Sequence, residues 1–286
     1  MDISVVMPVL NEEKYIRDCL HSILDNTVLP KEIIVCDGGS VDRTVEIVKE
    51  FPNIIILDNV HKTAASGRNI GIEHASGEII AFTDGDCYVD NTWIEQIQQC
   101  FSSKDIDGLR GKITPAESGN RYEIFWNNVA LNVVMTFDNV PRRIMSKSVK
   151  ECLVTANCAY KREALLKLNG FDIWFGNNAE DTDLSWRALG SQLFLYYQPS
   201  VKVYAHGATT LRSIRQKSFR NGVSSSKLQK RHGKRINFDV NLYKMLIRNF
   251  IGLFMRTPDA GLNLFGLTWH LLGKYYGSIK VWVINL

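Results

Sequence analysis

The sequence predicts an α/β protein in which a mostly parallel β-sheet is flanked by helices. Two observations support this fold class. Short apolar segments alternate with segments of helical periodicity over the first hundred residues, which is typical of βαβ units. Polar residues or glycines follow the apolar segments, as expected where parallel strands end at a ligand-binding edge. With 286 residues, 45% of them hydrophobic, the chain can form one large domain with an appendage, and a disordered chain is excluded.

The predicted elements alternate regularly up to residue 83. Strands are expected at residues 3–7, 32–36, 54–57 and 78–83, each a short apolar run. Helices are expected at residues 16–24, 42–50 and 63–75. The first helix has apolar residues at spacings of three and four, and Ser40 or Asp42 is expected to cap the second.

The middle of the chain has a less regular pattern. Strands are expected at residues 109–113, 155–160 and 201–204, and helices at residues 122–134 and 180–189. The segment 142–150 carries four cations and predicts a mobile loop. Six cysteines form no CxxC pair, which argues against structural zinc and favours buried thiols in a reducing compartment. Residues 3–10 are apolar but follow no basic segment, so we expect no signal peptide and a cytosolic catalytic part.

Charge divides the sequence into an acidic body and a basic tail. Residues 201–286 contain 15 Lys and Arg against 2 Asp and Glu, whereas residues 1–200 contain 19 against 28. We therefore expect a domain at 1–210 and a basic amphipathic helical region at 211–286 that meets an anionic partner. Apolar residues interleave with the tail cations, which favours the cytoplasmic membrane surface over nucleic acid.

The last segment of the tail, residues 262–284, predicts a helix with one small or polar stripe. The stripe consists of Asn263, Gly266, His270, Gly273, Lys274, Gly277 and Lys280. Because Lys274 lies near the centre of the segment, we expect the helix to lie in the membrane interface and not to span the bilayer. The alternative is a helix packed on the protein's own body.

Acidic residues follow two predicted strands and open one predicted helix. Asp84 and Asp86 flank a glycine directly after the fourth strand, where two carboxylates can bind a divalent cation and a ribose or diphosphate. A solvated turn is the alternative interpretation. Asp37 follows the second strand and begins either a ligand-binding turn or a capped helix start. Glu180 and Asp181 begin an acidic tetrapeptide that helix capping alone does not explain.

Together these residues resemble the family 2 glycosyltransferases, which have the GT-A fold. The resemblance covers residues 1–210, in the order of the family's motifs. Its segments are Pro8-Val9-Leu10-Asn11-Glu12, Asp37-Gly38-Gly39-Ser40, Arg68-Asn69-Ile70-Gly71, Asp84-Gly85-Asp86, Asn169-Gly170-Phe171-Asp172, Glu180-Asp181-Thr182-Asp183 with Trp186-Arg187, and His206.

The resemblance implies a nucleotide site at the ends of the strands. Pro8, Glu12 and Asp37 would line the nucleotide pocket, with Asp37 near the base. Arg68 would approach the base or the diphosphate, and Asp84 would contact the ribose or a metal-bound water.

The resemblance also implies a metal site and a catalytic pair. Asp86 would bind Mn²⁺ or Mg²⁺, with His206 as a further ligand or a diphosphate contact. Asp181 would act as the catalytic base, with Glu180 beside it shaping the acceptor site. A neighbouring acidic group would raise the pKa of that base.

The implied activity is metal-dependent, inverting transfer of one sugar from a UDP-, GDP- or dTDP-sugar. The QxxRW motif of processive synthases is missing, so single transfers are expected. The acidic pair favours a sugar hydroxyl on a polyprenyl-linked acceptor at the membrane, because a lipid phosphate needs no base. Two alternatives are a polyprenyl-phosphate glycosyltransferase and a sugar-phosphate nucleotidyltransferase, although the second usually needs a glycine-rich loop that residues 1–26 lack.

Overall fold

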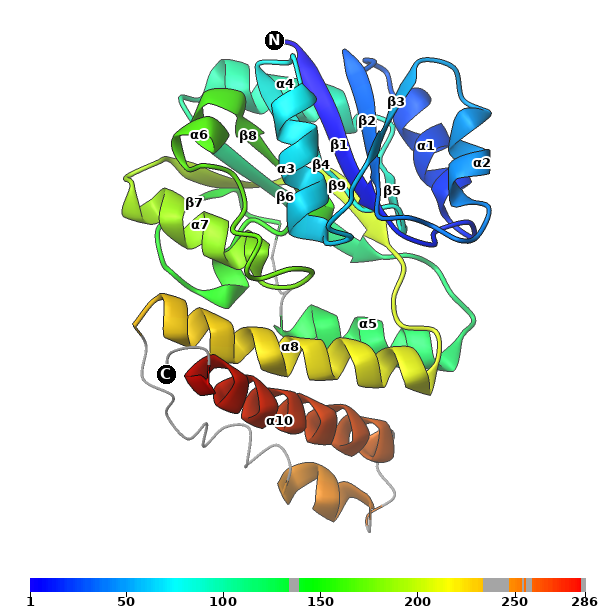
Figure 1. The fold of residues 1–286 in the computed structure, drawn as a ribbon, viewed down its shortest axis with the longest axis vertical. Coiled ribbons are helices and arrows are strands. Elements are labelled where there is room, and N and C mark those ends of the chain that lie inside the picture. The colour runs from blue at the N-terminus through cyan, green and yellow to red at the C-terminus, as the bar shows by residue number, and fades with distance from the viewer. Residues whose placement is uncertain (134–138, 234–246, 254, 256–258, 284–286) are drawn as a thin grey trace. The chain divides into compact units, whose positions relative to one another are not determined.

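The computed structural model describes residues 1–133, 139–233, 247–253, 255 and 259–283 (Figure 1). The chain forms two compact units. Unit 1 comprises Met1–Ala116 and Leu131–His206, and unit 2 comprises Glu117–Ala130 and Gly207–Leu286. Unit 2 is therefore built from two separate stretches of the chain, and most of its residues come from the second.

Unit 1 is built on a nine-stranded sheet with the order β3-β2-β1-β4-β8-β6-β9-β5, in which β7 also pairs with β9. The strands are β1 (Ile3–Val9), β2 (Glu32–Asp37), β3 (Ile54–Asp58), β4 (Ile79–Phe82), β5 (Cys87–Val89), β6 (Gly108–Pro115), β7 (Arg142–Ile144), β8 (Cys158–Lys161) and β9 (Leu195–Ala205). The first four strands pair in parallel. The remaining pairs are antiparallel except for β6 with β9. The predicted α/β fold class is thus confirmed, and the parallel pairing is concentrated in the first half of the sheet.

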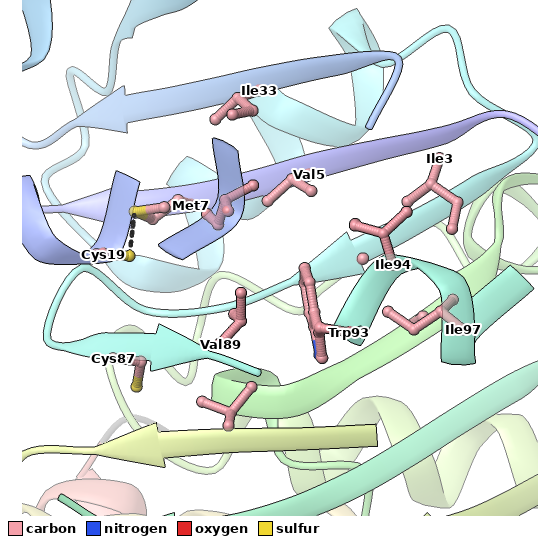
Figure 2. Packing of buried hydrophobic residues seen from close by; sticks show 14 of the residues in the cluster. Ile3, Val5, Met7, Cys19, Ile33, Cys87, Val89, Trp93, Ile94 and Ile97 are labelled. Carbon is pink, nitrogen blue, oxygen red and sulfur yellow. Dashed lines mark hydrogen bonds between the residues drawn. The ribbon is translucent and has the colours of Figure 1, made fainter. Parts of the chain in front are cut away.

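The helices of unit 1 bury both faces of the sheet. They are α1 (Ile16–Leu24), α2 (Thr44–Lys49), α3 (Ala64–His74), α4 (Trp93–Ser103), α6 (Arg162–Lys167) and α7 (Glu180–Gly190). Along β1, Val5 and Met7 belong to one apolar cluster and Val6 to another, because successive strand residues point to opposite faces. Figure 2 shows the first cluster, in which Met7 of β1 lies near Cys19 of α1. Trp93 of α4 belongs to the same cluster. A parallel sheet buried on both faces explains the apolar runs of the sequence.

Several elements differ from the sequence-based expectation. The segment predicted as a mobile loop, 142–150, contains β7 and a 3₁₀ turn at Val149–Glu151, because its backbone completes the sheet beside β9. The strand predicted at 155–160 begins with a 3₁₀ turn at Thr155–Asn157 and becomes strand β8 only from Cys158. The sequence pattern also did not predict β5, α4 and α6.

Unit 2 is helical in its described residues. It contains α5 (Arg121–Val133, whose last three residues belong to unit 1), α8 (Leu211–Arg231), a helical segment at 247–253 and α10 (Ala260–Val283). A small apolar cluster joins Phe125 of α5 to Ala208 and Ile214. The helix predicted at 262–284 is confirmed as α10. Within the described residues no helix has both the length and the apolarity required to span a bilayer.

Candidate active site

The carboxyl ends of the parallel strands bring the predicted acidic turns to one edge of the sheet. Val9 at the end of β1 is in register with Asp37 at the end of β2, and the Gly38 N–H donates to the Val9 carbonyl at 2.9 Å. Strand β4 lies on the other side of β1 and ends at Phe82, just before Asp84. The loops after these three strands therefore share the edge at which ligands bind in α/β sheets.

Hydrogen bonds between the loops hold this edge in one conformation. The Glu12 N–H donates to Thr44 Oγ1 at 2.7 Å, and the Glu13 N–H donates to Asp42 Oδ2 at 3.1 Å. The Asn11 N–H donates to Ser40 Oγ at 2.9 Å. Asp42 also accepts the Thr44 N–H at 3.0 Å. Helix α2 begins at Thr44 with Arg43 as its N-cap and no side-chain capping bond, so the prediction that Ser40 or Asp42 caps this helix was wrong.

Asp37 is buried, and its carboxylate accepts hydrogen bonds from its own turn. Oδ2 accepts the Gly39 N–H at 2.9 Å, and Oδ1 accepts the Ser40 hydroxyl at 2.5 Å. Gly39 has a φ of +83°, which an L side chain rarely adopts. The turn is therefore preformed, and a contact between Asp37 and a nucleobase stays a prediction. Pro8 is half-buried beside Gly67 of α3, where an added Cβ would lie 3.0 Å from the proline.

Arg68 of α3 connects the end of β4 to the start of α7. Its guanidinium donates to Asp84 Oδ1 and to Glu180 Oε1, both at 2.7 Å. The side chains of Arg68 and Glu180 are only 3% and 5% exposed, whereas that of Asp84 is 34% exposed. Burial disfavours the charged guanidinium, but the two carboxylates outweigh it and raise the pKa of Arg68 above its ordinary value. Two carboxylates engage the guanidinium in the interior, and an approach of Arg68 to the base or the diphosphate stays a prediction.

Glu180 and Asp181 form a carboxyl pair whose pKa values are both raised. Burial raises the pKa of Glu180 to about 7, although the charge of Arg68 opposes this shift. Among the described residues, the second carboxylate oxygen of Glu180 has no hydrogen-bond partner. Desolvation likewise raises the pKa of Asp181, against the charge of Arg68 and the Thr182 N–H, which donates to Asp181 Oδ1 at 2.6 Å. Carboxyl groups with raised pKa values are suited to accept protons near neutral pH.

The backbone before this pair is held in an unusual conformation. Ala179, the residue before α7, has a φ of 68°, in the left-handed region that is costly for a residue with a Cβ. One turn of α7 is bridged by an ion pair: buried Asp183 pairs with Arg187 at 2.7 Å, and Arg187 also donates to the Gly170 carbonyl outside the helix. Asn69, next to Arg68, donates to the Phe171 carbonyl at 2.8 Å and accepts the Phe171 N–H at the same distance. The Asn169–Asp172 motif therefore acts as a brace between α3 and α7.

Asp86 and His206 are neighbours across the β5–β9 pair. The His206 N–H donates to the Asp86 carbonyl at 3.0 Å, and the His206 ring stacks on Tyr15 with ring centroids 4.3 Å apart. Burial raises the pKa of the Cys19 thiol, and the charges of Asp86, Asp84 and Glu12 raise it further, so these three carboxylates lie around one buried sulfur. No group of three or more His, Cys, Asp or Glu side chains close enough to hold a metal occurs in the described part of the chain.

Of the predicted site residues, the structure thus joins Asp84, Arg68 and Glu180 in one ion-pair network with Asp181 beside it, and Asp86 with His206. It places Asp37 and Pro8 at the same sheet edge. One further residue was not predicted: Arg110 of β6, which is almost fully buried and donates to the Lys150 carbonyl at 3.0 Å and to that of Cys152. Burial lowers the pKa of Arg110 to about 10, against the opposing charges of Cys152 and Asp181. A cation inside a predicted apolar strand was the available signal.

The fold and the arrangement of carboxylates at its parallel edge define a GT-A protein, and comparison with known proteins agrees. The model of the family described as glycosyl transferase family 2 matches residues 4–168. The chain therefore belongs to glycosyl transferase family 2.

Curated relatives agree with this assignment. The chain is 31% identical over 160 residues to glycosyltransferase AglE of Haloferax volcanii, covering 51% of this chain and 50% of that protein. It is 34% identical over 218 residues to glycosyltransferase GlyA of Streptococcus pneumoniae, covering 71% of this chain and 30% of that protein. The chain thus spans about half or less of the length of these relatives.

Among solved structures, the mannosyltransferase PcManGT from Pyrobaculum calidifontis, in complex with GDP-Man and Mn²⁺, matches with a TM-score of 0.69 at 15% identity, covering 97% of this chain and 86% of that one. Residues 1–349 of TarS from S. aureus, in complex with UDP, match with a TM-score of 0.55 at 15% identity, covering 98% and 91%. At these identities the likeness shows a shared fold.

Proposed function

We propose that the protein is a metal-dependent, inverting glycosyltransferase that moves one sugar from a nucleotide-diphospho-sugar to a hydroxyl of a lipid-linked acceptor. One observation carries this proposal. The buried cation of Arg68 joins a carboxylate at the ligand-binding edge of the sheet, Asp84, to a carboxyl pair with raised pKa values, Glu180 and Asp181. In this proposal Asp84 binds the donor and Asp181 accepts the proton, and Arg68 connects Asp84 to Glu180 beside Asp181.

On the donor side, Pro8, Glu12 and Asp37 would line the nucleotide pocket and Asp84 would contact the ribose. Support comes from the hydrogen bonds that brace the loops after β1 and β2, because a preorganised site loses less free energy to ordering when a ligand binds. Solved structures with this fold were obtained with UDP, UDP-GlcNAc or GDP-Man. We therefore expect a UDP-, GDP- or dTDP-sugar as the donor.

The chemistry of the available side chains fits Mn²⁺ or Mg²⁺. Asp86 offers a carboxylate and His206 an imidazole, and these two residues are held together by a backbone hydrogen bond. Magnesium is commonly held by one or two carboxylates together with substrate phosphates, so a protein cluster of three ligands is not required. Asp86 and His206 would hold the ion, which neutralises negative charge on the diphosphate leaving group when bound.

On the acceptor side, Asp181 would take the proton of the attacking hydroxyl. Attack opposite to the departing diphosphate inverts the configuration at the anomeric carbon. Glu180 would stay in its ion pair with Arg68 and shape the acceptor site, while its charge state tunes that of Asp181. A raised pKa makes Asp181 a stronger base than an ordinary exposed carboxylate, which suits a weakly acidic sugar hydroxyl. A lipid phosphate would need no such group.

A thermal-shift panel tests the donor assignment. UDP-, GDP- and dTDP-sugars are each added with and without Mn²⁺, and we expect one nucleotide class to raise the melting temperature, more strongly with the metal. Replacing Asp86 with asparagine should abolish the metal-dependent part of the shift, whereas the exposed control Asp105→Asn should not. No stabilisation by any nucleotide sugar contradicts the proposal.

Product analysis tests the mechanism. With the donor class fixed, transfer to lipid-linked saccharides and to polyprenyl phosphate is compared for the wild type and Asp181→Asn. We expect transfer to the hydroxyl acceptor, inverted anomeric configuration, and a loss of at least about a hundredfold in the variant. Transfer to polyprenyl phosphate that survives in Asp181→Asn would favour the phosphate-acceptor alternative.

A further inference from the structure

In unit 2, helices α8 and α10 run side by side, and small residues form their contact (Figure 1). A Cβ added to Gly273 would lie 2.0 Å from the Phe219 carbonyl oxygen, and one added to Gly222 would lie 2.0 Å from the His270 carbonyl oxygen. Ser226 Oγ donates to the Lys274 carbonyl at 2.8 Å. The two backbones therefore touch, and the small stripe of α10 faces its neighbour.

Four large apolar residues of α10 are exposed and lie on one side of the helix. Leu272, Tyr275, Tyr276 and Ile279 are between 47% and 71% exposed. Their spacing of three, four and seven residues puts them on one helix face. A helix pair surrounded by water ordinarily buries such residues and exposes its small and polar ones. The arrangement here is the reverse, which is how helices pack where lipid surrounds them.

The same two helices are rich in positive charge. Helix α8 contains seven Lys and Arg residues and no acidic residue, and Arg212, Arg220 and Lys230 are among its exposed cations. Helix α10 adds Lys280, also exposed, and likewise contains no acidic residue. A second copy of this chain would bring like charges together, whereas an anionic lipid surface complements both the cations and the apolar side chains.

We infer that the face of α10 formed by Leu272, Tyr275, Tyr276 and Ile279, defined here as the apolar face, inserts into the headgroup region of an anionic bilayer while the cations of α8 contact the lipid phosphates. The helix lies along the surface, in keeping with the finding that no described helix is able to span a membrane. This inference deepens the proposed function, since a lipid-linked acceptor is presented at such a surface, but binding itself requires no catalysis.

Vesicle co-sedimentation of the full chain tests the apolar face. Phosphatidylcholine vesicles with and without phosphatidylserine are used at about 0.15 M salt. We expect binding only to the anionic vesicles, and at least about tenfold weaker binding by the triple variant Leu272→Ser, Tyr275→Ser and Ile279→Ser. The matched control is Leu29→Ser with Leu166→Ser, which removes exposed apolar residues of unit 1 and should bind as the wild type does.

A variant that lacks two cations of α8 provides an independent measurement that does not depend on α10. The variant Arg212→Gln with Arg220→Gln should weaken binding to anionic vesicles and reduce its dependence on salt, whereas Lys49→Gln with Lys167→Gln should do neither. Circular dichroism establishes that each variant is folded.

Three results would overturn the inference. These are failure of the wild type to bind anionic vesicles, undiminished binding by the folded triple variant, and a dimer in sedimentation velocity that the triple variant abolishes while vesicle binding is absent. The last result would mean that the apolar face is a contact between copies. Donor-induced thermal shifts, measured without vesicles on the same samples, report separately on the proposed function.

Discussion

Replacing Arg68 with methionine removes the cation that two carboxylates share, and the cost should depend on pH. The Arg68–Glu180 pair counts as fully buried, while Asp84 keeps a third of its side chain in solvent. Breaking a buried pair by removing one partner costs about 3–5 kcal/mol, and the loss at Asp84 is smaller because water can replace the arginine. We therefore expect the variant to lose about 3–5 kcal/mol of unfolding free energy at pH 8.

At pH 6 the loss should be smaller, because Glu180 can be protonated. In the wild type the pKa of Glu180 in the folded state is about 7, above its unfolded value of 4.5. The folded protein therefore binds the extra proton between these values, and stability falls as pH rises through that window. Without Arg68 the folded pKa rises further and the window extends upward. Between the two folded-state pKa values, Glu180 is protonated in the folded variant but ionised in the folded wild type. Each pH unit of this interval adds about 1.4 kcal/mol to the unfolding free energy that the variant loses relative to the wild type.

A double-mutant cycle measures this coupling. Hydrogen exchange of peptides from α3 and α7 in increasing urea gives the unfolding free energy of unit 1 for the wild type, Arg68→Met, Glu180→Gln and the double variant. In the double variant, Glu180→Gln removes the buried carboxylate that Arg68→Met leaves without its partner. It should therefore restore most of the unfolding free energy that Arg68→Met loses at pH 8, and little of it at pH 6. Additive effects of the two substitutions, or a loss that does not change between pH 6 and pH 8, would refute the reasoning.

Three further outcomes follow from the same region. Ala179→Gly should raise the melting temperature of unit 1, since it relieves about 1 kcal/mol of left-handed backbone strain; a lower value contradicts this. Gly170→Ala should cost about 2 kcal/mol in urea unfolding, because the position has a φ of +61° and the new Cβ would lie 2.4 Å from Asn69 Oδ1, and an unchanged midpoint speaks against a brace. The pH–rate profile should lose activity as pH falls through a value above that of an ordinary carboxylate, since Asp181 must be ionised and its pKa is raised by burial; an acid limb near pH 4 is the opposing result.

The first half of the sheet was predictable from local pattern. Strands β1 to β4 are short apolar runs between polar turns, and their order along the chain forces parallel pairing through helical crossovers. The later strands were harder to predict. Strand β7 carries two arginines, whose guanidiniums lie over the rings of Tyr197 and Phe194, so a segment that looks like a charged loop completes the sheet. Its pairing partner β9 is more than fifty residues away, beyond the reach of any local pattern.

By itself the sequence determined that this is an α/β protein whose first four strands are parallel and end in acidic turns, because periodicity and turn chemistry are local properties. Only the tertiary structure decided that Arg68 is shared between Asp84 and Glu180, residues separated from it by 16 and 112 positions. Likewise, the small stripe of α10 was visible in the sequence, but only contact with α8 decided that it faces inward and leaves Tyr275 exposed. Both depend on which distant segments meet, and burial at those contacts sets the charge states and the exposed surface on which function rests.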